Sequence, residues 1–321
     1  MQFDPRTLIA KLAPFDATKP SAFEGYSDYC RFYGLEFGER VSSQHLGQLE
    51  IDQQQIAIHL FRHPQPQGTL LIVHGYLDHH GLYQHLIRYG LERRLNVVCF
   101  DLPGHGLSSG KRAAIDSFER YQTVFQALLE GLDDWQLHRP LHLLGQSTGG
   151  AVINHYLLSQ RPQLDGQVVL LAPLVRAARW PWVWLAHSML SPWRASVARQ
   201  YHANTHDADF NAFLPSDPLQ SATITTDWVG AMKRWVPGFL SLPGADYPTL
   251  IIQGQQDTTV DWRYNLKILE QKFPRSQTLL IDNARHQLAN ESASIRDQYV
   301  NWLDQQGVAQ PEAKPLQTEA G

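Results

Sequence analysis

Leu141-His142-Leu143-Leu144-Gly145-Gln146-Ser147-Thr148-Gly149-Gly150 is a mostly apolar run that leads directly into a Gly-x-Ser-x-Gly motif, and residues 151–158 continue with a helical pattern. A strand, a sharp turn and a helix in this order form the setting in which Gly-x-Ser-x-Gly marks a nucleophile elbow. Such a turn strains the backbone at Ser147 and holds its hydroxyl clear of the sheet. A serine in an ordinary glycine-rich loop is the alternative, because the motif alone often occurs by chance.

The glycines of this motif have steric roles in the predicted turn. Side chains at Gly145 and Gly149 would collide with the strand and the helix that the turn brings together, and Gly150 lets the helix pack close to the sheet. The N-terminus of this helix also presents free N–H groups and the positive end of its dipole where an oxyanion would form.

The chain of 321 residues is long enough for one large α/β domain with an insertion, or for two small domains. Hydrophobic residues make up 43% and charged residues 18%, which indicates a folded protein with a sizeable core. The net charge of −4 gives no basic surface, so nucleic acid is not an expected partner. Cys30 and Cys99 suggest neither a disulfide framework nor a zinc site. The N-terminus lacks a signal-peptide pattern and no apolar run could span a membrane, so we expect a soluble, cytoplasmic protein.

Strand and helix patterns alternate along most of the chain. Periodicity predicts strands at residues 46–51, 55–62, 69–73, 96–100, 141–144, 167–171, 249–254 and 278–281. It predicts helices at residues 27–35, 84–93, 118–135, 151–158, 264–273 and 294–303. This alternation indicates an α/β fold, with a mostly parallel sheet and helices on both faces. His74, Ser147 and Pro173 follow strands, at the sheet edge where reactive groups gather in such folds.

The alternation stops between Pro173 and about residue 246, where six of the nine tryptophans and no clear strand are found. We interpret this segment as a helical cap over the strand ends. The predicted organisation begins with an N-terminal extension, residues 1–40, that packs on the core. The α/β core consists of residues 41–173 and 247–304, and the cap, residues 174–246, lies between these two parts. Residues 305–321 are predicted to be a flexible tail.

A serine hydroxyl needs a base within hydrogen-bond reach, and the base needs an acid that orients it. In this kind of sheet the three follow the chain order serine, acid, histidine. Asp257 is the first acid just beyond a strand end after the cap, and His286 is the first histidine beyond the next strand, with none later. We therefore predict Ser147, Asp257 and His286 as the catalytic residues. Asp261, which is expected to begin a helix, and Asp282, which is close to His286 in sequence, are the rival acids.

The tetrahedral intermediate of such chemistry needs two hydrogen-bond donors. The backbone N–H of Thr148, directly after the serine, is one expected donor, and the backbone N–H of Tyr76, in the loop after the strand at 69–73, is the other.

Five segments carry residue patterns that go beyond the triad. They are His74-Gly75-Tyr76-x-Asp78-His79-x-Gly81-x-Tyr83, Asp101-x-x-Gly104-His105-Gly106-x-Ser108-x-Gly110, Gly145-x-Ser147-x-Gly149-Gly150, Gly254-x-x-Asp257 and His286-Gln287-Leu288-Ala289-Asn290-Glu291. In this order they resemble the monoacylglycerol lipase and lysophospholipase group of serine α/β-hydrolases. The resemblance covers about residues 45–305. It implies an eight-stranded α/β-hydrolase core, a cap, no cofactor, and hydrolysis of an ester of a lipid-like substrate.

The chain departs from the pattern of that group at several positions, but none of these departures removes a catalytic atom. Gln146 stands where the group usually has histidine, and Thr148 where it often has methionine. Asp78 and Gln287 each replace a glutamate, and Leu82 replaces an arginine. These changes affect the contacts around the oxyanion loop and the leaving-group site, and hence the choice of substrate.

Histidines and tryptophans outside the triad have simpler explanations than a metal or a cofactor. No carboxylate or cysteine completes a site for the group His79, His80, His85 and His105, and the resemblance implies that His79 and His105 fix loops. His202 and His206 have the spacing of one helix face and are expected at the cap surface. We expect no metal, and we expect some tryptophans of the cap to line an acyl pocket.

The predicted function is a serine hydrolase that cleaves carboxylic esters of lipid-like substrates, monoacylglycerol or lysophospholipid, through an acyl-enzyme. A short-chain carboxylesterase, an iminopeptidase or amidase, and a non-catalytic binding protein on the same fold are the alternatives. The sequence Gly75-Tyr76-Leu77, in place of a glycine-proline run, disfavours the iminopeptidase, and a complete triad disfavours the binding protein. We expect transient contact of the cap with a membrane surface and no obligate protein partner.

Overall fold

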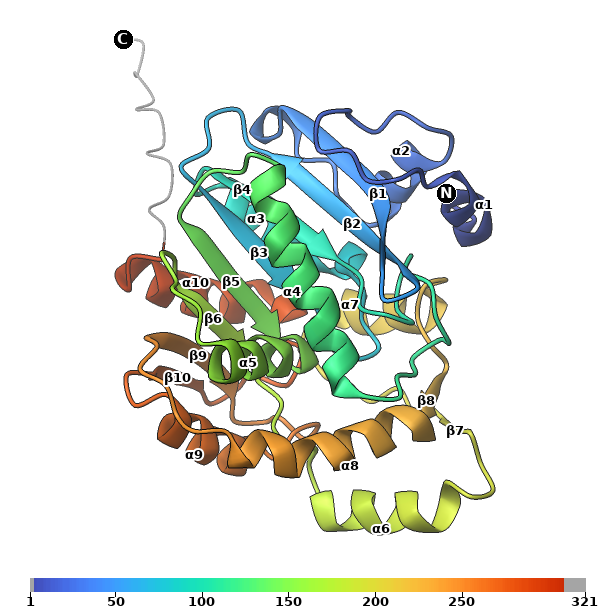
Figure 1. Ribbon diagram of the computed structural model, residues 1–321, viewed down its shortest axis with the longest axis vertical. Coiled ribbons are helices and arrows are strands. Elements are labelled where there is room, and N and C mark those ends of the chain that lie inside the picture. The colour runs from blue at the N-terminus through green and yellow to red at the C-terminus, as the bar shows by residue number, and fades with distance from the viewer. Residues whose placement is uncertain (1–2, 309–321) are drawn as a thin grey trace.

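The computed structural model describes residues 3–308 and is built around a sheet of eight strands (Figure 1). The strand order is β1-β2-β4-β3-β5-β6-β9-β10. β2 is antiparallel to both of its neighbours, and the remaining neighbours pair in parallel, so the mostly parallel eight-stranded sheet is confirmed. The strands are β1 (Ser43–Ile51), β2 (Gln54–Arg62), β3 (Gly68–Val73), β4 (Leu95–Phe100), β5 (Leu141–Gln146), β6 (Val168–Leu171), β9 (Thr249–Gly254) and β10 (Gln277–Ile281).

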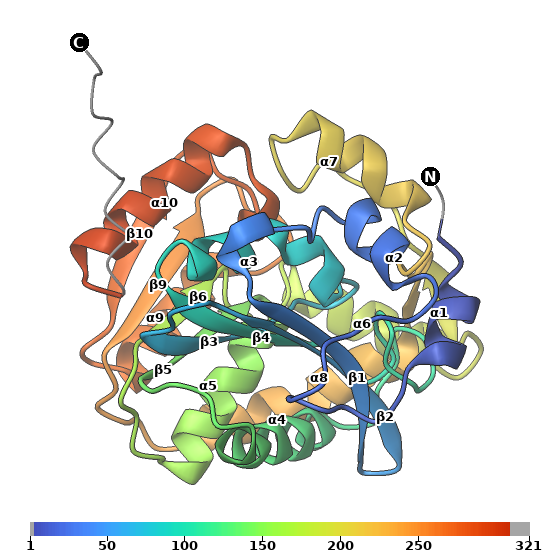
Figure 2. The same cartoon turned by 90° about the horizontal axis from the view of Figure 1, so that it is seen from above.

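Helices cover both faces of this sheet, as Figure 2 shows. α3 (Gln84–Leu91) and α10 (Ala293–Gln305) contribute to one core layer, and α4 (Phe118–Asp134), α5 (Thr148–Gln160) and α9 (Trp262–Lys272) contribute to the other. Successive side chains of a strand point to opposite faces, so the fully buried strands feed both layers. In β3, Leu70 and Ile72 belong to the first layer, whereas Leu71 and Val73 belong to the second.

The segment before β1 packs against the sheet edge. α1 (Pro5–Lys11) has no counterpart among the predicted helices, whereas α2 (Tyr26–Phe32) overlaps the predicted range 27–35. Both helices lie beside β1 and β2 (Figures 1 and 2), and Tyr29 is fully buried in the same core layer as α3. The predicted tail lies mainly at residues 309–321, outside the described residues, while Val308 near its start is buried.

Residues 174–246 contain three helices and also a small sheet. The helices are α6 (Trp180–Leu190), α7 (Ala208–Phe213) and α8 (Thr226–Ser241). The prediction of a cap without strands is wrong in one respect, because β7 (Ser196–Ala198) pairs antiparallel with β8 (Thr223–Thr225). Strands of three residues are too short to show a period in the sequence.

Two further details of the cap differ from the sequence analysis or refine it. His202 and His206 lie in the irregular segment between β7 and α7 and not on a helix, but both are exposed, as predicted for histidines at the cap surface. The tryptophans divide into two sets: Trp182 and Trp193 are 70% and 85% exposed, whereas Trp235 is buried against Phe118. Within residues 3–308, no helix combines the length and the hydrophobicity that crossing a membrane requires.

Candidate active site

The turn between β5 and α5 holds Ser147 at the carboxyl end of the central strand. Its backbone lies at φ 53° and ψ −112°, a combination that residues with a side chain rarely adopt. The Ser147 N–H donates to Leu171 O (2.9 Å) and its carbonyl accepts from Leu174 N (3.1 Å). These bonds to β6 and to the segment after it hold the strained turn in place.

Two glycines make this turn sterically possible. A Cβ at Gly149 would lie 2.0 Å from Val73 O, and a Cβ at Gly145 would lie 2.6 Å from the carbonyl carbon of Gly149. Both distances are far below any tolerated contact. The steric prediction for these positions is confirmed, since the helix packs directly onto the ends of β3 and β5.

The structure brings Ser147, His286 and Asp257 into one hydrogen-bonded chain. The Ser147 hydroxyl lies 3.1 Å from His286 Nε2, and His286 Nδ1 lies 2.7 Å from Asp257 Oδ2. Ser147 follows β5, Asp257 lies in the loop after β9 and His286 lies in the loop after β10. All three are buried, so water competes little for these hydrogen bonds.

The contact between Asp257 and His286 shifts the pKa of each group in the direction that favours its charged form. Burial alone would lower the pKa of His286, but the Asp257 carboxylate raises it above the usual value. Burial alone would raise the pKa of Asp257, but His286 and the backbone N–H groups of Thr259 and Val260 lower it. Gln253, which the sequence analysis missed, also donates to Asp257 Oδ2 (3.1 Å). The carboxylate is therefore fixed at both oxygens.

The rival acids have other partners. Asp261 caps α9 by accepting from Tyr264 N and forms a close pair with Arg176, as expected for a residue that begins a helix. Asp282 accepts a hydrogen bond from the side chain of Gln255. Neither has a hydrogen bond to His286 among those found in residues 3–308.

The two expected oxyanion donors flank the serine. Thr148 is the first residue of α5, and Tyr76 lies in the loop after β3; both line the same cavity as Ser147 and His286. The Tyr76 ring stacks on Trp228 of α8 at 3.8 Å, and its hydroxyl donates to Ala113 O (2.8 Å). These contacts fix one face of the Tyr76 ring and its hydroxyl group.

The departures at positions 78, 146 and 287 form one connected network. Gln146 Nε2 donates to His286 O (2.8 Å) and to Gln287 Oε1 (2.9 Å). Gln287 Nε2 donates in turn to Asp78 Oδ2 (2.9 Å), which also accepts from the Tyr83 hydroxyl (3.0 Å). The network joins the loop after β10, which carries His286, to the loop after β3, which carries Tyr76 and Asp78, through the neutral amide groups of Gln146 and Gln287.

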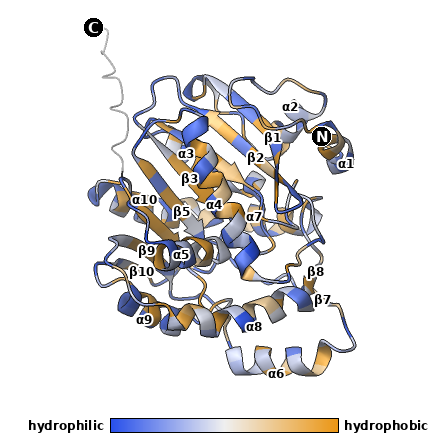
Figure 3. Cartoon of the chain, viewed as in Figure 1, coloured by the Kyte–Doolittle hydropathy of each residue, from blue (hydrophilic) through white to orange (hydrophobic). Residues whose placement is uncertain are grey.

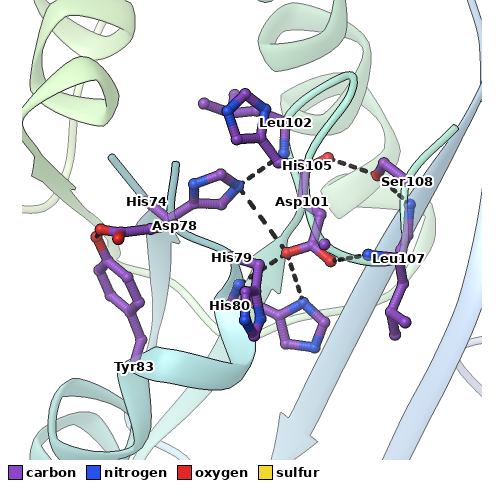
Figure 4. Close-up of polar contacts among 12 residues, drawn as sticks. His74, Asp78, His79, His80, Tyr83, Asp101, Leu102, His105, Leu107 and Ser108 are labelled. Atoms are coloured by element: carbon purple, nitrogen blue, oxygen red, sulfur yellow. Dashed lines mark hydrogen bonds and ion pairs between the residues drawn. The ribbon is translucent and has the colours of Figure 1, made fainter. Parts of the chain in front are cut away.

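A second polar cluster fixes the loops after β3 and β4 (Figure 4). The Asp101 carboxylate accepts from His80 N (2.7 Å), His80 Nδ1 (2.9 Å) and Leu107 N (2.7 Å). Burial alone would raise the pKa of Asp101, but His80 outweighs it and the pKa lies far below the usual value. Burial lowers the pKa of His74 to about 3, and its Nε2 accepts from Leu102 N (2.9 Å), so this ring is neutral.

His79 and His105 contact groups in loops and in the cap. His79 Nε2 lies 2.9 Å from Asp217 Oδ2, and His105 Nδ1 donates to Pro103 O (2.9 Å). Within residues 3–308, no group of three or more His, Cys, Asp or Glu side chains is placed to hold a metal ion.

A cavity of about 380 Å³ lies next to Ser147, and we call it the active-site cavity. Its lining includes apolar side chains, among them Leu174, Ala177, Val183, Phe210, Leu214, Ile224, Trp228, Val229, Met232 and Val260. It also includes the polar side chains of Asp78, Arg199, Gln200, His202, Asn204 and Gln287. Of the cap tryptophans, Trp228 lines the cavity, whereas Trp182 and Trp193 point to solvent.

The family of the chain follows from a match that spans the elbow, the cap and the triad. Residues 64–293 match the family model described as serine aminopeptidase, S33. The chain belongs to this family. Within the S33 family it is a serine α/β-hydrolase of the monoacylglycerol lipase group, as the sequence motifs predict.

Solved structures of lipases share the fold. The structure of the monoacylglycerol lipase from Paleococcus ferrophilus gives a TM-score of 0.66 at 21% identity and covers 77% of this chain and 98% of that chain. A soluble variant of monoglyceride lipase from Saccharomyces cerevisiae, in complex with a substrate analogue, gives 0.69 at 18% identity and covers 81% and 94%. The α/β-hydrolase fold is therefore confirmed.

Relatives by sequence include lipases and a phospholipase. Human monoglyceride lipase is 26% identical over an alignment of 275 positions, which covers 78% of this chain and 86% of that protein. Phospholipase YtpA from Bacillus subtilis is 34% identical over 110 residues. That match spans 34% of this chain and less than half, 41%, of the relative. These similarities agree with a serine hydrolase of the lipase and esterase type.

Proposed function

We propose that this protein is a serine hydrolase that cleaves carboxylic esters with an apolar acyl chain through an acyl-enzyme intermediate. The observation that carries the proposal is the hydrogen-bonded chain from Ser147 through His286 to Asp257, at the edge of a half-apolar cavity. A buried imidazole paired with a carboxylate is the arrangement that activates a serine hydroxyl.

The reaction follows from the order of these groups. Ser147 Oγ attacks the ester carbonyl while His286 Nε2 takes its proton. The protonated imidazole, stabilised by Asp257, then gives the proton to the departing alcohol oxygen as the carbon–oxygen bond breaks. Water attacks the acyl-enzyme by the same route, with His286 again as the base, and Ser147 is released with the carboxylic acid.

The backbone N–H groups of Thr148 and Tyr76 bind the oxyanion of each tetrahedral intermediate in this proposal. Thr148 N lies in the first turn of α5, where helical N–H groups have no partner within the helix. The helix dipole adds to the stabilisation of negative charge at this position. Because the backbone donates, the side chains at these two positions are free to differ from those of relatives.

The lining of the cavity offers both kinds of contact that a lipid ester needs. The apolar side chains of α8 and of the segment after β6 suit an acyl chain, because burial of each methylene contributes about 0.8 kcal/mol. The polar side chains of Gln287 and Arg199 suit the alcohol that leaves. A monoacylglycerol or a lysophospholipid fits this description, and the similarity to human monoglyceride lipase and to phospholipase YtpA supports it.

An aminopeptidase is the second candidate, because the S33 family model carries that description. Such an enzyme must bind a free, positively charged amino terminus. Among the described residues that line the cavity, the one Lys or Arg is Arg199 and the one Asp or Glu is Asp78. The Asp78 oxygen Oδ2 is already bonded to Tyr83 and Gln287, and Arg199 would repel a cation, so the ester substrate is favoured.

We also propose that the cap contacts a lipid surface through α6. No side chain of this helix is buried, and its exposed apolar residues include Trp184, Leu185 and Met189. Figure 3 shows α6 as an outlying helix in mostly pale and orange shades. Arg179 and Arg194, on either side of this helix, are exposed, and residues 174–206 contain no Asp or Glu, which favours an anionic surface. Val183 on the same helix lines the cavity.

The test of the proposed reaction uses Ser147→Ala. This variant should lose hydrolysis of p-nitrophenyl esters by roughly 10⁴-fold or more, because no neighbouring group replaces the nucleophile. A fluorophosphonate probe should label the wild-type chain at Ser147, located by peptide mass spectrometry, and should leave the variant unlabelled. Circular dichroism checks that the variant is folded.

Ser159→Ala is the matched control, because Ser159 lies on the same helix but is exposed and outside the cavity. Activity retained by Ser147→Ala would point to another nucleophile. A folded wild-type protein that neither reacts with the probe nor cleaves any ester would instead favour a binding protein. Faster cleavage of aminoacyl p-nitroanilides than of p-nitrophenyl esters would favour the aminopeptidase.

A further inference from the structure

Arg199 holds a positive charge at the wall of the active-site cavity. It follows β7, and its backbone N–H donates to Ala222 O (2.9 Å), which extends the pairing of β7 with β8. The small cap sheet thus fixes the position from which the side chain starts. The side chain is half-buried and lines the same cavity as Ser147 and His286.

The contacts of the guanidinium group are with uncharged groups. Nη1 donates to the amide oxygen of Gln220, and the guanidinium carbon lies 4.7 Å from the centre of the Tyr201 ring. No carboxylate of residues 3–308 forms an ion pair with it, in contrast to half-buried Arg176, which pairs with Asp261 at 2.6 Å. Arg199 is therefore held in place without a close counter-ion.

Such an arrangement leaves electrostatic energy available to a ligand. Burial lowers the pKa of Arg199, which shows that the protein removes part of its hydration. Asp78 attracts the Arg199 guanidinium group from beyond ion-pair distance. Burial also raises the pKa of Asp78, which disfavours the charged carboxylate and so weakens its attraction for Arg199. A partly desolvated cation gains most from an anion that reaches it directly.

The position of Arg199 places this charge on the alcohol side of the substrate. Gln200, His202 and Asn204 follow Arg199 in the chain and also line the cavity. Asn204 O accepts a hydrogen bond from Gln287 N (2.9 Å), so the segment 199–204 is bonded to the loop that carries His286. In the proposed reaction His286 gives its proton to the departing alcohol, so a segment bonded to the loop of His286 is placed to meet that alcohol.

We propose that Arg199 is a specificity-determining residue that binds an anionic oxygen group, phosphate or carboxylate, on the alcohol part of the ester. A guanidinium group offers a planar pair of N–H donors that matches both groups. The proposal rests on the proposed function, since it concerns the leaving group of that reaction. It predicts that esters of charged alcohols, such as glycerol phosphate, are better substrates than the neutral glycerol ester.

The experiment compares three octanoyl esters below their micelle concentrations, so that the charge of an aggregate has no effect. They are 1-octanoylglycerol, its 3-phosphate and the octanoyl ester of glycerate. Wild-type kcat/KM should be higher for at least one charged ester than for 1-octanoylglycerol. Arg199→Gln should reduce that ratio by about tenfold or more, and Arg199→Lys should recover part of it. The phosphate and glycerate esters distinguish the two anions.

Arg263→Gln, an exposed arginine on α9 outside the cavity, is the matched control and should leave the ratio unchanged. If Arg199→Gln does not fold, the wild-type protein alone gives the answer. Glycerol 3-phosphate or glycerate should then inhibit hydrolysis of 1-octanoylglycerol competitively, at concentrations at which glycerol does not.

Two outcomes would overturn the proposal: no preference for either charged ester, or a ratio that is the same in Arg199→Gln and wild type. Fluorophosphonate labelling of Ser147 in each variant separates this result from failure of the proposed function. A labelled enzyme that cleaves simple esters without the preference refutes the role of Arg199 alone.

Discussion

His286 lies between two oxygen atoms, and in the proposed reaction its protonation decides whether Ser147 can be activated. Its Nδ1 faces Asp257 at 2.7 Å and its Nε2 faces the serine hydroxyl at 3.1 Å. Nε2 can accept the serine proton only when the imidazole is neutral. The carboxylate that orients the ring also favours its charged form, so the same contact that builds the triad limits its activity at low pH.

We expect kcat/KM for a neutral ester to fall as pH decreases through the pKa of His286, with a midpoint above 6.5, the usual value for histidine. The sign follows from the direction of the shift. The folded protein favours the protonated ring, and the protonated ring is inactive as a base, so the loss begins at a higher pH than for an unperturbed histidine. Initial rates with p-nitrophenyl butyrate at constant ionic strength measure this limb.

Asp257→Asn removes the charge that raises the pKa, so the midpoint should move to lower pH while kcat falls by roughly 10⁴-fold. His79 is the competing source of such a limb, because Asp217 outweighs burial and raises its pKa as well. His79→Gln is therefore the control and should leave the midpoint in place. A midpoint that responds to His79 and not to Asp257 would contradict the assignment.

At this scale the sequence indicated the residues of the triad better than their surroundings. The chain order of Ser147, Asp257 and His286 and their positions after predicted strands can be read directly from the sequence, so these three residues were predictable. Gln253 and Arg199 could not be found in this way. Gln253 lies within a buried strand, and Arg199 sits in a segment without periodicity, so only the fold shows which groups they face.

One buried ion pair connects the cap to the loop after β3, which carries Tyr76. His79, three residues after Tyr76, lies 2.9 Å from Asp217 Oδ2, and both side chains are fully buried. The Tyr33 hydroxyl donates to the other oxygen at 2.6 Å. Burial alone would raise the pKa of Asp217, but His79 lowers it, and Asp217 in turn raises the pKa of His79, so both shifts favour the charged pair. Three segments that are far apart in sequence therefore meet at one carboxylate.

We expect Asp217→Ala to lower the free energy of unfolding by about 3 kcal/mol, because it leaves the protonated His79 without its partner in a buried site. Asp227→Ala is the matched control. Asp227 also joins the cap to the core, through a 2.5 Å pair with Lys111, but both side chains are exposed and the expected loss is below about 1 kcal/mol. Urea denaturation of the three proteins measures the difference. Equal losses for the two variants would show that burial does not govern the contribution of the pair.

Elements were predictable where the chain repeats a simple pattern. The core strands and the long helices, such as α4, show periods of two or 3.6 residues, or unbroken apolar runs. α1 and the pair β7 and β8 were missed because they are short. The local signals of α1, the N-cap Asp4 followed by Pro5, precede a helix of only seven residues. Asp217 shows the same limit, since no feature of residues 214–221 indicates an ion pair with a loop almost 140 positions away.

The whole molecule places its most apolar exposed surface on one outlying helix. α6 lies beyond α8 on the side away from the sheet (Figure 1), and its side chains together with Trp193 form this surface. The cavity reaches the same helix at Val183. Exposed tryptophans and arginines together favour the interface of an anionic membrane, where the rings lie at head-group level and the cations meet phosphate.

We expect the wild-type protein to sediment with vesicles that contain anionic phosphatidylglycerol and to bind less to vesicles of phosphatidylcholine alone. The double variant Trp182→Ser, Trp193→Ser should bind the anionic vesicles at least about tenfold more weakly than the wild type, because it removes the two most exposed rings. Leu280→Ser, an exposed apolar residue on the edge strand β10, is the control for general loss of hydrophobic surface. The variants should keep their rate on a water-soluble ester and differ from wild type only with esters held in vesicles. Equal binding by all three proteins would mean that α6 does not face the lipid, and the apolar surface would then need another partner.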